Sequence, residues 1–205
     1  SATMIQRRLI MRHAVVLAVL ALFAIAGPAT ADGIDTSFKS IGDPNAPVTI
    51  VEYASMSCSH CANFHTQRLP WLKETYIDTG KVRLEFRDFP LNAPALWGAM
   101  AAHCAGPERY FAFLDLLFRQ QENWAFFEDA GDRLKKLARL AGMGSGEFDL
   151  CMANQSVQMA VLQSRQTGVS EHKVESTPSL VINGETVAGV LSEKDLARMI
   201  EAAGG

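Results

Sequence analysis

The order of strands and helices is the feature that most constrains how this chain can fold. Residues 47–54 (PVTIVEYA) are rich in β-branched side chains and predict a buried strand. After a short turn, residues 58–79 have helical character, with a kink expected at Pro70 because proline lacks an N–H donor. The alternating pattern of residues 82–87 predicts a second strand. A strand, a helix and a strand with short connections form a βαβ unit, so we expect two parallel strands in an α/β protein.

The sequence after this unit is first helical and then returns to strands. Helices are predicted at residues 108–121, 128–140, 146–153 and 157–167. Strands are predicted at residues 178–182 and 186–189, on either side of an Asn183-Gly184 turn. Ser192 is expected to cap a last helix that runs to Ala202. The predicted order is therefore βαβ, a run of helices, then ββα.

The N-terminal residues have the pattern of a targeting signal. Several arginines precede an unbroken apolar run at residues 14–26, and residues 29–31 (ATA) form the small-x-small pattern of a signal-peptidase site. A helix of this length reaches roughly 20 Å, which is too short for a hydrocarbon core of about 30 Å. We therefore expect residues 1–31 to be a cleaved signal peptide, with residues 1–3 a remnant of cloning, and a periplasmic location. An uncleaved anchor or a buried helix is the alternative, and the Arg7-Arg8 pair leaves the general secretory and twin-arginine routes both open.

Cys58 and Cys61 are separated by Ser59 and His60 at the start of the first predicted helix. This spacing lets the two sulfurs meet within one turn, and the first sulfur faces N–H groups that the turn leaves unpaired. Those N–H groups and the positive end of the helix dipole favour the thiolate of Cys58, and His60 should lower the pKa of Cys58 further. We predict a redox pair in which Cys58 is the attacking, partly exposed thiol and Cys61 is the buried resolving cysteine. The alternatives are a structural bridge or a zinc half-site, although the sequence has no second Cys-x-x-Cys or His-x-x-x-His motif.

Three segments resemble the DsbA-like family of thiol:disulfide oxidoreductases. They are residues 42–53 (GDPNAPVTIVEY), 57–65 (SCSHCANFH) and 87–91 (RDFPL). The resemblance implies a thioredoxin fold interrupted by an inserted all-helical domain. We therefore expect residues 32–93 and 168–205 to form the thioredoxin-like domain and residues 94–167 to form the insertion. Ser59 is a departure, because the strongest oxidants of the family have proline at this position.

The resemblance also extends to a loop before the third predicted strand. Thr177-Pro178 is similar to the family's cis-proline opposite the active site, where a cis bond would turn the Thr177 backbone toward the sulfurs. A trans proline at a sheet edge is the alternative. Glu52 on the first strand is either a solvated strand residue or a buried acid that moves protons to and from Cys61.

The remaining cysteines and histidines are expected to have structural roles. Cys104 and Cys151 both lie in the helical region, and an oxidising compartment favours a second, non-catalytic disulfide between them. Two separate buried thiols are the alternative. His65, His103 and His172 are predicted to be structural or surface residues.

The predicted function is an exported thiol:disulfide oxidoreductase that donates its Cys58–Cys61 disulfide to folding proteins. It needs no cofactor, and the resemblance implies a quinone-linked membrane partner of the DsbB type. A net charge of −3 gives no basic surface for nucleic acid. We expect a monomer, because only residues 32–46 precede the fold, whereas isomerases of this kind dimerise or trimerise through an N-terminal extension. A reductase or isomerase is the nearest alternative, and a copper- or zinc-binding module using Cys58, His60 and Cys61 is the alternative from another class.

Overall fold

The computed structural model describes residues 33–205, of which residues 34–205 form one compact unit. The predicted signal peptide at residues 1–31 lies outside the described residues. Within the described part of the chain, no helix combines the length and the apolar character needed to cross a membrane.

A five-stranded sheet organises this unit, with the strand order β1-β3-β2-β4-β5. The strands are β1 (Lys39–Ile41), β2 (Val48–Ala54), β3 (Val82–Asp88), β4 (Ser179–Ile182) and β5 (Glu185–Ala188). The two central strands β2 and β3 are parallel, as predicted, with Ile50 opposite Leu84 and Glu52 opposite Phe86. The other neighbouring pairs are antiparallel. This topology, with a run of helices between β3 and β4, confirms the predicted fold class of a thioredoxin fold with a helical insertion.

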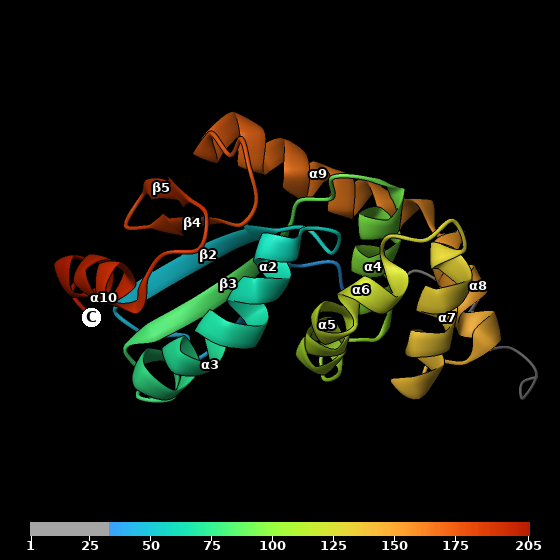
Figure 1. The fold of residues 1–205 in the computed structure, drawn as a ribbon, viewed down its shortest axis with the longest axis horizontal. Coiled ribbons are helices and arrows are strands. Elements are labelled where there is room, and N and C mark those ends of the chain that lie inside the picture. The colour runs from blue at the N-terminus through green and yellow to red at the C-terminus, as the bar shows by residue number, and fades with distance from the viewer. Residues whose placement is uncertain (1–32) are drawn as a thin grey trace, which may run out of the picture. The chain divides into compact units, whose positions relative to one another are not determined.

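The helix predicted at residues 58–79 is divided into four short segments, which follow one another between β2 and β3 (Figure 1). They are α2 (Ser59–Asn63), the π-helical η1 (Phe64–Arg68), α3 (Leu69–Leu72) and the π-helical η2 (Lys73–Ile77). Pro70 lies in the first turn of α3, a position where helices tolerate a missing N–H. The kink predicted at Pro70 is thus a junction where α and π turns alternate.

The later helices follow the predicted pattern with shifted ends. They are α4 (Ala93–Cys104), α5 (Tyr110–Arg119), α6 (Gln121–Trp124), α7 (Ala130–Leu140), α8 (Ser145–Met152), α9 (Gln155–His172) and α10 (Glu193–Ala202). Ser192 caps α10 by accepting a hydrogen bond from the Asp195 N–H. The predicted end of the insertion after residue 167 falls inside α9, which continues until Lys173 adopts a left-handed conformation at φ 55°.

Both faces of the sheet are covered. On one face, Ile50, Leu84 and Leu180 pack with side chains of the α2–η2 segment and of α10. On the other face, Tyr53 lies against α9, in agreement with the position of α9 across the sheet end in Figure 1. Gly168 of α9 permits this approach, because a Cβ there would lie 2.9 Å from the Tyr53 ring. The α2 helix and its cysteines therefore belong to the face shared with α10.

Residues 32–46 were expected to be an irregular segment leading into the fold, and this is wrong for part of it. Lys39–Ile41 forms the edge strand β1, which pairs antiparallel with β3. A strand of three residues is too short to show a local period, and its partner comes much later in the chain. The pairing is therefore decided by tertiary contact.

Cys104 and Cys151 are joined by a disulfide, with their Cα atoms 6.1 Å apart. Cys104 is the last residue of α4, and Cys151 lies in α8. The bond closes a loop between residues that are 47 positions apart in the sequence. It connects two helices of the insertion and includes neither Cys58 nor Cys61.

Removing this bond should destabilise the protein. For a loop closed over 47 positions, the chain-entropy model gives a loss of about 4 kcal/mol in the free energy of unfolding. We expect a Cys104→Ala/Cys151→Ala variant to show this loss in denaturant titrations. The equilibrium of the Cys58–Cys61 pair with glutathione should stay within about twofold of wild type. A change in that equilibrium with unchanged stability would contradict this assignment.

Candidate active site

The turn between β2 and α2 places Cys58 at the carboxyl end of β2 and at the N-terminus of α2. Cys58 is the N-cap residue of α2, with an extended backbone (φ −93°, ψ 116°). Its Sγ accepts a hydrogen bond from the Cys61 N–H at 3.4 Å, in the way that a serine or aspartate oxygen caps other helices. The thiol donates to the Thr177 carbonyl oxygen at 3.2 Å. The sulfur is therefore held between the helix start and the loop before β4.

This environment lowers the pKa of Cys58 from 9.0 to about 5. The largest cause is a hydrogen bond from the Cys61 side chain to the Cys58 sulfur. Burial acts in the opposite direction, while the Thr177 side chain and the backbone N–H groups of Cys61 and His60 lower the pKa further. Cys58 is consequently a thiolate at neutral pH, the form that acts as nucleophile and as leaving group.

Cys61 has the opposite character. Its side chain is fully buried, and burial raises its pKa far above the ordinary value. The neighbouring Cys58 sulfur and the charge of Glu52 raise the pKa of Cys61 further, against a hydrogen bond from the Ser55 N–H at 3.5 Å. In the reduced pair the Cys61 sulfur therefore carries a proton at neutral pH.

The two residues between the cysteines are exposed. The sequence suggested that the His60 ring lowers the pKa of Cys58. That role of the ring stays a prediction; the contribution of His60 named among the causes comes from its backbone N–H, which the start of a helix provides. Ser59 and His60 form the solvent-facing surface beside the attacking sulfur.

Thr177-Pro178 comes directly before β4 and has a cis peptide bond. The Thr177 hydroxyl oxygen is buried and has no hydrogen-bond partner within residues 33–205, so its O–H can turn toward the Cys58 sulfur. The structure thus brings Thr177 to Cys58 from a position more than a hundred residues later in the chain.

Glu52 of β2 is fully buried and has a partner that the sequence did not predict. Nε2 of His65 is 3.1 Å from both carboxylate oxygens of Glu52, and the His65 side chain is only 3 % exposed. The i, i+4 spacing of Cys61 and His65 places both on the buried face of one helical segment, which is the signal that could have found it. The two other histidines lie elsewhere. His103 pairs with Asp88 at 2.8 Å, and the His172 ring packs on Tyr53.

Gln121 is a second residue that the sequence did not indicate. Its buried side-chain amide donates hydrogen bonds to the carbonyl oxygens of Met56 at 2.9 Å and of Cys58 at 3.0 Å. These contacts fix the active-site turn from α6, which belongs to the helical insertion. No local pattern marks them, because they join residues more than sixty positions apart.

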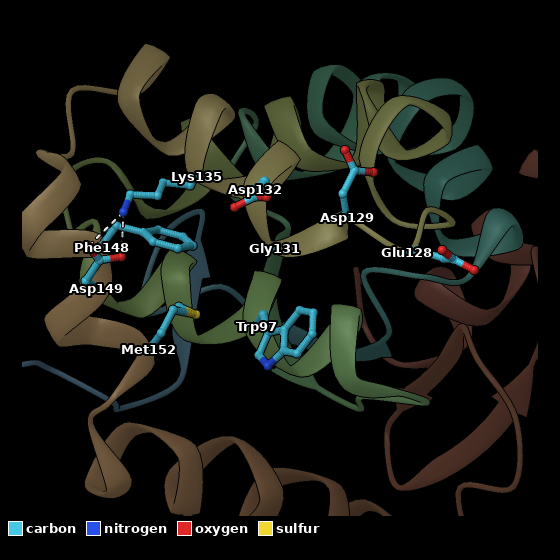
Figure 2. Close-up of a pocket in the computed structure, with 9 residues that line it drawn as sticks. All are labelled: Trp97, Glu128, Asp129, Gly131, Asp132, Lys135, Phe148, Asp149 and Met152. Atoms are coloured by element: carbon cyan, nitrogen blue, oxygen red, sulfur yellow. Dashed lines mark hydrogen bonds and ion pairs between the residues drawn. The ribbon is translucent and has the colours of Figure 1, made fainter.

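A different hollow, of about 380 Å³, lies within the insertion between α4, α7 and α8 (Figure 2). Trp97 and Phe148 form its apolar part, and Lys135 bonds Asp149 at 2.6 Å at its side. It contains no cysteine, so the candidate active site is the one around Cys58. Among residues 33–205, no group of three or more His, Cys, Asp or Glu side chains is placed to hold a metal ion.

Comparison with known proteins agrees with this geometry. A family model described as thioredoxin matches residues 36–202. The chain belongs to the thioredoxin family. Within this family it is similar to the crystal structure of α-DsbA1 from Wolbachia pipientis, with 29% identity and a TM-score of 0.75 over 82% of this chain and 90% of that one. BdbD from Bacillus subtilis, at 19% identity and a TM-score of 0.73 over 81% and 92% of the two chains, shares the fold.

Relatives known from their sequences carry names of the same kind. A Rickettsia typhi protein named as a protein-disulfide oxidoreductase is 29% identical over 152 residues, which cover 74% of this chain. This chain spans only 56% of the length of that relative. Together with the α-DsbA1 structure, these similarities confirm the resemblance to DsbA-like proteins.

The pKa of Cys58 should depend on the side chain at position 61. Cys61→Ser keeps a donor to the Cys58 sulfur, so the pKa should stay within about one unit of its value in the reduced wild type. Cys61→Ala removes the donor, and the pKa should rise by more than one unit. Thiolate ultraviolet absorbance against pH measures this, with His60→Ala as the control that should change little.

The rate of reaction with a small disulfide should follow the same ionisation. Because only the thiolate reacts, the rate in reduced wild type should rise through about pH 5 and be level at neutral pH. A rate that still rises between pH 7 and 9, as for a free thiol with a pKa of about 8.5, would contradict the lowered value.

Proposed function

We propose that this chain is a thiol:disulfide oxidoreductase that donates its Cys58–Cys61 disulfide to folding proteins. The observation that carries this proposal is the contrast between the two sulfurs. Cys58 caps a helix with a pKa lowered to about 5, whereas Cys61 is fully buried with a raised pKa. A pair of this kind has one sulfur that leaves readily and one that is kept from solvent.

The reaction begins with the disulfide closed between Cys58 and Cys61. A substrate thiolate attacks Cys58 Sγ, the Cys58–Cys61 bond breaks, and Cys61 leaves with the electron pair and takes up a proton. A second substrate thiolate then attacks the substrate sulfur of the mixed disulfide, and Cys58 leaves as a thiolate. The substrate dithiol is oxidised by two electrons and the cysteine pair is reduced by two.

Glu52 is the residue proposed to give and take the Cys61 proton. It is fully buried, and its charge is the smallest of the named causes that raise the pKa of the Cys61 thiol. The remaining site residues orient the sulfurs. The Thr177 carbonyl oxygen accepts from the Cys58 thiol, and the Thr177 hydroxyl can turn toward the same sulfur. Pro178 follows Thr177 in this loop, and Ser59 and His60 border the sulfur on the solvent side.

The lowered pKa of Cys58 also favours donation of the disulfide over reduction of other proteins. A stabilised thiolate stabilises the reduced pair, and a stable reduced form makes the disulfide a stronger oxidant. The largest contribution comes from the Cys61 side chain, which Ser59 in place of proline leaves intact. An oxidase is therefore favoured over an isomerase or a reductase.

We propose the location, the substrates and the redox partner together with this activity. Substrates would be reduced or unfolded exported proteins in the periplasm, reached through the N-terminal signal peptide. The reduced pair would be reoxidised by a DsbB-like quinone reductase in the membrane. The protein would act as a monomer and without a cofactor, since thiol exchange needs only the two cysteines.

Equilibration with glutathione buffers tests the direction of the reaction. The fraction of the Cys58–Cys61 pair that is oxidised, counted by alkylation and mass spectrometry, should give a potential well above the roughly −270 mV of thioredoxin. A thioredoxin-like value would move the assignment to a reductase.

Turnover on a reduced, unfolded protein tests the roles of the residues. Cys58→Ser should abolish oxidation, because no mixed disulfide can form. Glu52→Gln should slow it by about tenfold or more, in line with loss of a proton-transfer group. The Cys104→Ala/Cys151→Ala variant serves as a control with two cysteines removed elsewhere, and it should keep wild-type turnover at temperatures where it is folded.

A further inference from the structure

The proton that Cys61 gains and loses has to cross a buried region. Cys61 and Glu52 are both fully buried, so neither can exchange a proton directly with water. We propose that His65 relays this proton between Glu52 and solvent, which reaches His65 through a neighbouring cavity. This inference rests on the proposed function and adds to it a residue that acts through Glu52.

The contact between His65 and Glu52 has the geometry that a relay needs. Nε2 of His65 is equidistant, at 3.1 Å, from the two oxygens of Glu52. Either oxygen can therefore receive or supply a proton without a change in the position of the ring. Histidine is the side chain that gains and loses a proton near neutral pH and carries a nitrogen at each side of its ring.

Aromatic rings fix the His65 side chain in this orientation. The His65 ring is stacked on Phe118 of α5, with 4.1 Å between centroids and 23° between planes. Phe86 of β3 and Phe64 contact it edge-on, each at 5.7 Å. The ring is thus held between the sheet, η1 and α5 with Nε2 directed at the carboxylate.

The same residue lines a cavity of about 430 Å³ that is mostly apolar and partly open to solvent. The cavity lies between the α3 region and α5, and Leu69, Pro70 and Phe111 form much of its wall. Pro70 is exposed, so this wall reaches the surface. His65 is the one lining residue that also contacts Glu52, and so it joins the buried carboxylate to the cavity.

The other charged groups around the cavity are held in ion pairs, so His65 is the residue we propose to carry the proton. Arg119 bonds Asp115 at 2.7 Å, and Lys73 bonds Asp78 at 2.6 Å. Arg68, on the same helical segment as His65, bonds Glu193. Of the titratable groups on the packed elements, Glu52 of β2 bonds His65 directly, while Lys73 of η2 and Asp115 and Arg119 of α5 line the same cavity as His65.

The relay can be followed when the reduced pair is reoxidised by oxidised glutathione. The Cys58 thiolate attacks the glutathione disulfide, and one glutathione leaves as a thiolate. The Cys61 proton then passes to Glu52 and by His65 to solvent. The Cys61 thiolate attacks Cys58 Sγ, and the second glutathione leaves with the electron pair of the broken bond. Only this second step needs the Cys61 proton to move.

Rapid mixing of reduced protein with oxidised glutathione, acid quenching and mass spectrometry separate the two steps. In His65→Gln, which keeps an N–H donor for Glu52 but no titrating ring, the first-order decay of the glutathione adduct should slow by about tenfold or more. The bimolecular formation of the adduct should stay within about twofold of wild type. A purely structural role of His65 would change both steps or neither, and either result would overturn the relay.

His103→Gln is the matched control, because His103 is also a buried histidine paired with a carboxylate, Asp88. It does not line the cavity, and both steps should remain as in wild type. If the His103 variant slows adduct decay as much as the His65 variant does, the effect is general to buried histidines and the relay is overturned.

His65→Ala gives a second, independent measurement. Its adduct decay should be slow and should recover as imidazole is added, because the ring can occupy the enlarged cavity. Pyrrole, which has the same ring size and no basic nitrogen, should not restore the rate. Recovery with both molecules, or with neither, would overturn the relay.

The same measurements distinguish a failure of the proposed function from a failure of the relay. If wild-type protein fails to oxidise dithiols, the proposed function fails and the relay fails with it. If Glu52→Gln slows adduct decay and His65→Gln does not, the proposed function stands and only the relay is overturned.

Discussion

One apolar cluster joins the sheet, the active-site turn and the helical insertion, and the properties of both cysteines depend on it. It includes Cys58 and Cys61 together with Phe86 of β3 and Trp124 of α6. Because the cluster keeps water from Cys61, it raises the pKa of that thiol, while the hydrogen bonds at the start of α2 overcome burial at Cys58. Two cysteines three residues apart thereby acquire opposite acidities from a single environment.

The insertion is consequently part of the active site and not only an addition to the fold. Gln121 reaches from α6 to the carbonyl groups of the active-site turn, and Phe118 of α5 stacks on His65. The loop before β4 contacts Cys58 from the opposite side. Three segments that are far apart in the sequence therefore fix a site whose reacting atoms lie within one helical turn.

The parts of this arrangement that could be predicted from the sequence are those with a local signal. The strands β2 and β3, the caps at Cys58 and Ser192 and the Asn183-Gly184 turn all follow from residues near one another in the chain. The pairing of His65 with Glu52 and the bonds from Gln121 could not be predicted in this way, because burial and a distant partner decide them. At His60 the backbone at a helix start adds a contribution that the sequence analysis assigned to the side chain alone.

The short strand β1 has a consequence for the sheet as a whole. A strand at the edge of a sheet presents unpaired N–H and C=O groups that can recruit another chain. Through β1, residues 39–41 occupy this position along residues 84–86 of β3, one of the two longest strands. The Arg87 side chain covers the neighbouring surface, with its guanidinium 4.1 Å from the Phe38 ring. Three residues of backbone thereby cover part of a central strand that would otherwise form the edge of the sheet.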